Sequence, residues 1–261
     1  MDLLYNLQLS VPYYVLDIDE NKARLYYGKS KKLEEIKTDD FPLIYDDTYD
    51  YSSSLGISLT AENDAPTEYV KDKYSLKKVR FENFLQQVDE QLFDYLKEGD
   101  VIILSGEKAN TSAFINRSLH AAKIINIINS PFETYTKKEL ASIAWKAIEA
   151  YTKEKLLYEV SEYKEKEGEG LSEHDIVQIW QAVEEGRGLS LLVEKDFWIE
   201  GYVQKQNPYI LYLHHPKPPY IMFPDAINQL IQMMIDKNGK VYILNKGMLK
   251  TPLPVGLITR F

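Results

Sequence analysis

The stretch Val101-Ile102-Ile103-Leu104-Ser105-Gly106 decides the fold class of this sequence. Four consecutive apolar residues before a turn dipeptide are typical of a strand buried on both faces of a sheet. A helix is predicted after this strand, over residues 109–120. Another is predicted before it, where apolar residues recur at helical spacing: Phe81, Phe84, Leu85, Val88, Leu92 and Leu96. A strand between two helices favours an α/β fold.

Short strands are predicted near the beginning of the chain. Residues 11–18 and 23–27 flank the turn residues Asp19-Glu20-Asn21, and residues 33–36 add a third short strand. Residues 39–67 show no periodicity and are rich in Asp, Ser and Tyr, which predicts a long loop. The first half of the chain is therefore expected to open with a β-meander.

Helix starts can be placed in the second half from capping residues. Thr136-Lys137-Lys138-Glu139 fits a capping box, in which the hydroxyl and the carboxylate accept hydrogen bonds from backbone amides at the helix start. Ser172 is expected to cap the helix around Trp180. Pro224 is expected in the first turn of the helix around Leu230, where a missing amide hydrogen costs nothing.

Three strands of the second half are expected to be neighbours in one sheet: residues 189–193, 241–244 and 255–259. Their apolar runs are too continuous for a sheet with one wet face, so helices should cover both faces. The available covers are the helices around Ile148, Trp180 and Leu230. The second half is therefore also expected to be α/β.

Composition excludes several kinds of site. The 261 residues include no cysteine, which excludes disulfides, thiolate metal sites and cysteine nucleophiles. The net charge of −9 disfavours general binding to a nucleic-acid backbone, and we expect no DNA partner. No apolar stretch approaches the roughly 18 residues of a membrane span, and the start of the chain lacks the basic segment of a signal peptide. We therefore expect a cytoplasmic protein with no membrane partner.

Few residues fit a catalytic or metal-binding pattern. Asp17 and Asp19 lie two apart on the first predicted strand, so they face one side and could hold a divalent cation in a nuclease. The simpler interpretation is that Asp19 begins the turn and Asp17 is solvated, since no motif fixes a third carboxylate. His214 and His215 are adjacent and point opposite ways on an extended chain. Gly186-Arg187-Gly188 lacks the partners of a phosphate loop and is better explained as a helix end before a strand.

The densest cluster of basic residues lies within residues 71–80, where Asp72 is the one acidic residue. It comprises Lys71, Lys73, Lys77, Lys78 and Arg80. Such a run can contact RNA phosphates, and it can also be the solvated start of a helix. These five residues are our candidates for contact with RNA or with a protein partner. We expect no catalytic, metal-binding or cofactor-binding residues.

Local motifs along nearly the whole chain follow a recognisable order. They include Tyr13-Tyr14-Val15-Leu16, residues 101–106, residues 186–193 and the terminal Pro254-Val255-Gly256-Leu257-Ile258-Thr259-Arg260-Phe261. This order resembles the bacterial relatives of the archaeal and eukaryotic peptide-chain release factor and Pelota families. The resemblance implies an RNase H-like middle domain at residues 1–132 and, at residues 133–261, an α/β sandwich like the family's C-terminal domain. It also implies a cytoplasmic role at the ribosome.

The sequence departs from the family where the family is catalytic. The resemblance implies a Gly-Gly-Gln loop just before a helix that begins Arg-Phe, and the counterpart helix is expected to begin at Arg80-Phe81. However, no glycine occurs between Gly56 and Gly99, and Gln86 and Gln87 fall on the helix instead. No segment resembles the family's codon-reading domain. We therefore expect neither codon reading nor hydrolysis of peptidyl-tRNA.

The leading functional hypothesis is a non-catalytic, translation-associated binding protein rather than an enzyme. Its expected partner is the ribosome or a ribosome-associated protein, in a rescue, hibernation or resistance role, and no cofactor is expected. One alternative is a metal-dependent nuclease that uses Asp17 and Asp19 on the RNase H-like domain. A second alternative is a protein-interaction module unrelated to translation.

Overall fold

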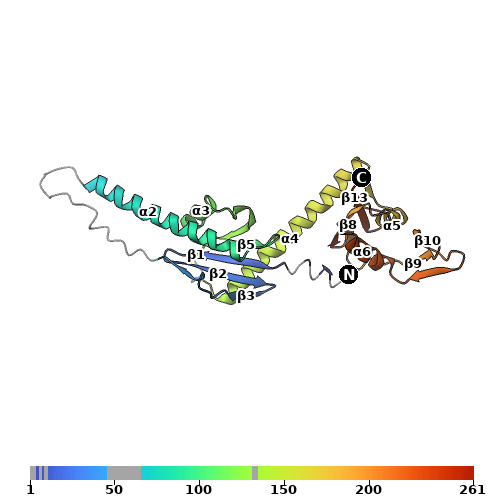
Figure 1. Cartoon of the computed structure of the whole chain (residues 1–261), viewed down its shortest axis with the longest axis horizontal. Helices are drawn as coiled ribbons and strands as arrows, with labels where there is room; N and C mark the ends of the chain where they lie inside the picture. Colours follow the sequence, from blue (N-terminus) through green and yellow to red (C-terminus); the bar gives the residue numbers. More distant parts are fainter. Residues whose placement is uncertain (1–3, 6–7, 9–10, 46–65, 131–134) are drawn as a thin grey trace. The chain divides into compact units, whose positions relative to one another are not determined.

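A computed structural model describes residues 4–5, 8, 11–45, 66–130 and 135–261, with the side chains of residues 66–74 excepted. The chain forms two compact units (Figure 1). We call Val11–Ile148 the N-terminal unit, and Glu149–Phe261 together with the described residues of Met1–Ser10 the C-terminal unit. Each unit has its own sheet and its own apolar core, which confirms the predicted two-domain α/β class.

The N-terminal unit is built on a mixed sheet. Its strands are β1 (Tyr13–Ile18), β2 (Lys22–Lys29), β3 (Lys32–Glu35), β4 (Leu43–Ile44), β5 (Val101–Gly106) and β6 (Ile124–Ile128). The strand order is β3-β2-β1-β5-β6, and β4 pairs with β2. Strands β1 and β5 run parallel with Val15 opposite Ile103, and every residue of both strands is buried. The predicted meander and the predicted central strand are confirmed.

Helix α2 (Pro66–Gln91) packs on this sheet through an apolar stripe. Phe84, Leu85 and Val88 share one core cluster with Leu16 of β1 and Leu104 of β5, as the helical spacing predicted. The expected helix start at Arg80-Phe81 is wrong, because α2 begins at Pro66. Apolar periodicity marks only the part of a helix that packs on a core, and the polar residues before Phe81 carry no such signal.

The segment after β5 differs from its prediction. Helix α3 (Lys108–Ile115) ends before His120, and the chain continues through a turn and the short 3₁₀ helix η2 (Ala121–Lys123). A second 3₁₀ helix, η1 (Leu92–Asp94), follows α2. Strand β6 was not predicted; it lies at a sheet edge and only Ile128 of its five residues is buried. The predicted loop over residues 39–67 contains β4, and its residues 46–65 lie outside the described part of the chain.

The C-terminal unit has a four-stranded sheet. Its strands are β7 (Ser172–Glu173), β8 (Gly188–Glu194), β12 (Lys240–Leu244) and β13 (Val255–Thr259), in the order β12-β8-β13-β7. Strand β8 pairs in parallel with β12 and antiparallel with β13. The prediction that these three strands are neighbours is confirmed, and the last strand lies between two others.

Helices cover both faces of this sheet. Trp180 of α5 (Ile176–Glu184) and Leu230 of α6 (Ala226–Asp236) share a core cluster with Leu191 of β8. Successive strand residues point to opposite faces, and Leu192 packs in a separate cluster with Leu156 of α4 (Lys137–Gly168). The prediction that helices cover both faces of this sheet is therefore confirmed. Helix α4 contacts the sheet through Leu156 and later residues rather than through Ile148.

A three-stranded sheet in the C-terminal unit was not predicted. Its strands are β9 (Gly201–Gln204), β10 (Asn207–Tyr212) and β11 (Tyr220–Phe223), in the order β10-β9-β11. Pro208 lies within β10, which is tolerated because β10 is an edge strand, and its carbonyl accepts a 2.9 Å hydrogen bond from Nε1 of Trp180. The proline in β10 and the exposed side chains of β10 and β11 remove the apolar pattern by which these two strands could be predicted from the sequence.

The capping residues were predicted with mixed success. Thr136 and Glu139 form the predicted capping box, with Thr136 N donating to Oε2 of Glu139 at 2.8 Å. Ser172 lies in β7 instead of capping α5, whose cap is the side chain of Asp175. Pro224 precedes the cap of α6, and Asp225 accepts from the amides of that helix. At both helix starts a nearby aspartate provides the N-cap.

Helix α4 continues from the N-terminal unit into the C-terminal unit. The division between compact units falls at Ile148, inside this helix, whereas the sequence places the domain boundary at 132 and 133. Residues 131–134 lie outside the described part of the chain. The assignment of residues 1–132 and 133–261 to two family domains stays a prediction.

Candidate functional site

Helix α2 carries the five basic residues that the sequence analysis singled out. The side chains of Lys77 and Lys78 are exposed and that of Arg80 is half-buried, and we call these three the cationic segment of α2. Lys71 and Lys73 belong to the same helix, but their side chains lie outside the described part of the structure. The structure thus places the candidates on one helix of the N-terminal unit.

Lys77 and Lys78 differ in their contacts with acidic side chains. Nζ of Lys78 lies 4.0 Å from Oε1 of Glu82, and the other oxygen of Glu82 lies 2.7 Å from Nη2 of Arg117. Lys77 forms no ion pair with any residue that the structure describes. Exposed ion pairs contribute little to stability, so Lys78 can exchange its partner easily. Lys77 is therefore the most available cation of the segment.

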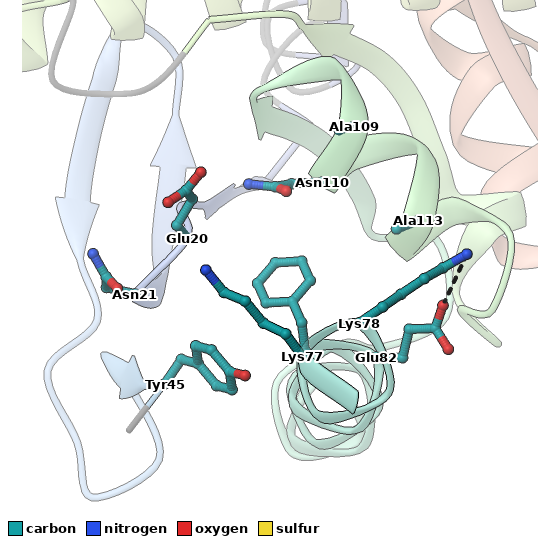
Figure 2. Close-up of a pocket in the computed structure, with 10 residues that line it drawn as sticks. Glu20, Asn21, Tyr45, Lys77, Lys78, Glu82, Ala109, Asn110 and Ala113 are labelled. Atoms are coloured by element: carbon teal, nitrogen blue, oxygen red, sulfur yellow. Dashed lines mark ion pairs between the residues drawn. The ribbon is translucent and has the colours of Figure 1, made fainter. Parts of the chain in front are cut away.

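Lys77 reaches into a cavity of about 390 Å³, which we call the α2–α3 cavity. Its walls come from α2, from α3, from the turn between β1 and β2, and from Tyr45 after β4. Figure 2 shows the amino group of Lys77 extended into this space, with Glu20, Asn21 and Asn110 around it. Lys78 points away from the centre, toward Glu82.

Aromatic rings separate the α2–α3 cavity from a second cavity. The rings of Tyr45 and Phe81 meet edge to face, with centroids 5.6 Å apart. Beyond Tyr45 lies a cavity of about 340 Å³, lined by Arg80, Asn83 and Gln87 among others. The middle of α2 therefore presents cations next to two cavities, an arrangement suited to binding.

The residues of the nuclease alternative do not form a metal site. Asp17 is 1% exposed, and its carboxylate accepts hydrogen bonds from Nε and Nη2 of Arg24 and from Oγ of Ser105. Asp19 accepts from the backbone amide of Glu20, as a turn residue does. Among the residues that the structure describes, no group of three or more potential ligands is placed to hold a metal ion. The interpretation of Asp17 as solvated was also wrong.

Sequence reasoning missed a buried polar cluster around Asp89 of α2. Its carboxylate accepts hydrogen bonds from Oγ of Ser118 and from the backbone amide of Leu119, and it lies 2.9 Å from Nδ1 of His120. Both the serine and the histidine bind the aspartate, so the hydroxyl is not presented to the imidazole as in a catalytic triad. These contacts join α2 to the segment after α3. Asp89 is about 30 residues from its partners in the sequence, so no local motif indicates the cluster.

The remaining candidates of the sequence analysis have structural roles. His215 lies between the hydroxyl groups of Tyr202 and Tyr220, at 3.2 Å from each, while His214 is exposed. Gly186 has a φ of +76°, which glycine adopts readily at a helix end, and Arg187 pairs with Glu185. Gln86 of α2 donates to Glu90 on the helix surface. No helix in the described residues is both long and apolar enough to span a bilayer.

Comparison with known proteins identifies the family. The model of bacterial archaeo-eukaryotic release factor family 3 matches residues 12–187. The chain belongs to this family. The match includes the whole sheet of the N-terminal unit, the cationic segment of α2 and both cavities. The family resemblance seen in the sequence is thereby confirmed, and no curated protein sequence matches the chain.

Solved structures of other proteins share the fold. Dom34 of S. cerevisiae, a translation termination-like factor that interacts with Hbs1, is 11% identical at a TM-score of 0.54, over 100% of this chain and 67% of that one. Archaeal Pelota, in a model of the ribosome-bound protein with ABCE1, is 15% identical at a TM-score of 0.53, over 97% of this chain and 62% of that one. In another Dom34 structure the chain covers 63% of the length. At such identities the likeness shows the fold alone.

Proposed function

We propose that the protein is a non-catalytic binding protein that acts in translation, at the ribosome. Family membership carries this proposal, because the family is named for archaeo-eukaryotic release factors and its model matches residues 12–187. The fold is shared with Dom34, described as a translation termination-like factor, and with a ribosome-bound Pelota. A rescue, hibernation or resistance role is the finer form of the same proposal.

Two features support binding rather than hydrolysis. The sequence has no glycine between Gly56 and Gly99, so no Gly-Gly-Gln segment stands just before Phe81 to position water beside a peptidyl ester. Arg80-Phe81 lies in the interior of α2 rather than at its start, and both glutamines after it belong to the helix. Asp17, Asp89 and His120 are engaged in buried hydrogen bonds that stabilise the fold.

We propose the cationic segment of α2 as a contact surface for the partner. Lys77 and Lys78 are exposed on a chain whose net charge is −9, so they form a local positive patch on a negative protein. Such a patch suits a short contact with RNA phosphates or with an acidic protein surface, and it does not suit wide coverage of ribosomal RNA. Arg80 belongs to the same segment, and Lys71 and Lys73 of α2 stay sequence-based candidates for this contact.

Charge reversal tests this contact. The double variant Lys77→Glu/Lys78→Glu should reduce co-sedimentation with purified ribosomes at least tenfold at low salt, and should weaken its salt dependence. The matched control is Lys31→Glu/Lys32→Glu, which reverses two adjacent exposed lysines of the same unit, at the end of the β2–β3 turn and the start of β3. Equal losses in both variants would mean that only net charge matters, and would overturn the proposed surface.

A further inference from the structure

One amide in the α2–α3 cavity is buried without a hydrogen-bond partner. Asn110, in the first turn of α3, is 9% exposed, and its Nδ2 has no acceptor in the part of the chain that the structure describes. Figure 2 shows this nitrogen on the side of the amide that faces Glu20 and the open space. A buried donor without an acceptor costs free energy, and such a cost is expected where a ligand supplies the acceptor.

Two further donors converge on the same space. Helix α3 starts in the cavity wall, and its N-cap residue Glu107 makes no side-chain capping bond. The backbone N–H groups of its first turn, residues 108–110, therefore have no acceptor within the helix and carry partial positive charge. Lys77 of α2 extends into the same cavity (Figure 2). Amide, backbone and ammonium donors together select an anionic group rich in acceptor oxygens, such as a phosphate.

The place of the cavity in the fold agrees with a ligand site. Strands β1 and β5 are parallel neighbours, and their carboxyl ends, Ile18 and Gly106, are paired in register. The cavity is lined by the turn that follows β1 and by the helix that follows β5. Crevices outside the carboxyl ends of parallel strands are where α/β sheets bind ligands, because the loops and helix N-termini meet there.

The rest of the cavity suits a planar ring and a sugar. Phe81 lines it and is backed by the ring of Tyr45, and the methyl groups of Ala109 and Ala113 complete an apolar wall. Aromatic side chains bind nucleobases by stacking, without regard to sequence. The carboxylate of Glu20, which also lines the cavity, is an acceptor for hydroxyl or amino hydrogens.

We propose that the α2–α3 cavity binds a nucleotide, with its phosphate at Lys77, Asn110 and the first turn of α3 and its base at Phe81. The volume of about 390 Å³ lies within the usual range for small-molecule sites. A free nucleotide and one nucleotide of an RNA strand present the same chemistry to these groups. The inference rests on the cavity alone and goes beyond the proposed role at the ribosome.

Isothermal titration calorimetry of the full chain tests it. The ligands are AMP, GMP, CMP and UMP, a short single-stranded oligoribonucleotide, and inorganic phosphate. At least one nucleotide or the oligonucleotide should bind, and Lys77→Ala and Asn110→Leu should each raise its Kd at least tenfold. Lys31→Ala, at an exposed lysine outside the cavity, should leave Kd unchanged. Asn110→Leu should keep or raise the melting temperature, because it removes a donor that has no partner in the free protein.

The outcomes distinguish a free nucleotide from an RNA strand as the ligand, and they also show when the proposal is wrong. Binding of mononucleotides identifies a free nucleotide, and binding of the oligonucleotide alone identifies an RNA strand. No binding at millimolar concentration, binding insensitive to both variants, or inorganic phosphate as tight as any nucleotide would each overturn the proposal. Because Lys77→Ala is a surface substitution, the test stands even if Asn110→Leu folds poorly. Loss of this site with intact ribosome sedimentation would leave the proposed function standing.

Discussion

Nη2 of Arg24 lies 2.8 Å from Oδ2 of Asp17, with the carboxylate 1% exposed between strands β1, β2 and β5. Oγ of Ser105 donates to the other oxygen of the same carboxylate at 3.0 Å. These bonds join three strands of the N-terminal sheet at one buried point. A carboxylate held in this way stabilises the sheet and is not available to coordinate a catalytic metal ion.

Asp17→Asn should therefore lower the stability of the protein. We expect no Mg²⁺-dependent nuclease activity in either the native protein or this variant. Loss of the negative charge leaves the guanidinium of Arg24 without its buried partner, which should cost about 3 kcal/mol in the free energy of unfolding. Urea denaturation measures this change. Asp19→Asn, at a turn residue, should stay within about 0.5 kcal/mol. Mg²⁺-dependent cleavage of RNA that disappears in Asp17→Asn at unchanged stability would favour the nuclease.

Stability should fall at alkaline pH because of buried tyrosines. Burial raises the pKa of Tyr13 to about 12, and its hydroxyl donates to the carbonyl of Ser30 at 2.9 Å. The unfolded chain releases this proton near pH 10, whereas the folded protein holds it. The stabilisation is therefore complete below about pH 10 and is lost as the pH rises to about 12.

Tyr13→Phe checks this pH dependence in chemical denaturation at pH 8, 10 and 11.5. The variant should lose less stability than the native protein between pH 10 and 11.5, because one group with a raised pKa is gone. Tyr209→Phe, at a residue that is 49% exposed, is the control and should leave the slope unchanged. Identical slopes for the native protein and Tyr13→Phe would contradict the assignment.

The last strand should be essential for the C-terminal unit. Strand β13 is buried throughout and lies between β8 and β7, so deletion of Val255–Phe261 would expose apolar surface on both neighbours. The truncated protein should be insoluble or should lose its cooperative unfolding transition. Deletion of Phe261 alone, which is 75% exposed, is the control and should leave the melting temperature nearly unchanged. A soluble truncation with native melting behaviour would show that β13 is an appendage.

The fold could be predicted from the sequence where burial is continuous or periodic. Strands β1, β5, β8 and β13 are buried at nearly all positions, and α5 and α6 each present one apolar stripe, so their residues alone identify them. Strands β6, β10 and β11 lie at sheet edges and are buried at few positions, so they lack that signal. Strand β9 is buried but only four residues long, and one of them is a glycine.

The candidate site was predicted only in part. A run of lysines and an arginine can be read from the sequence, and it led to Lys77 and Lys78. The cavity around Lys77 could not be predicted, because its walls come from the β1–β2 turn, Tyr45, α2 and α3, and only folding brings them together. Asn110 carried no motif, and its missing hydrogen-bond partner is visible only in three dimensions.

The protein should not release peptides from ribosomes. The sequence has no glycine between Gly56 and Gly99, and α2 continues through Arg80-Phe81, so no Gly-Gly-Gln loop lies directly before Phe81. Purified protein added to stalled ribosomes that carry labelled peptide should release no more label than buffer does. A hydrolytically active release factor serves as the positive control. Release above the buffer level would contradict the non-catalytic assignment.

Sedimentation of the tagged protein with ribosomes from lysate tests the central claim most directly. Gradients run at low and at moderate salt should show the protein in the ribosomal fractions, with less at moderate salt because part of the contact is electrostatic. Lys31→Glu/Lys32→Glu should follow the native protein into these fractions, and Lys77→Glu/Lys78→Glu should be depleted from them. Native protein that stays at the top of the gradient at both salt concentrations would contradict action at the ribosome.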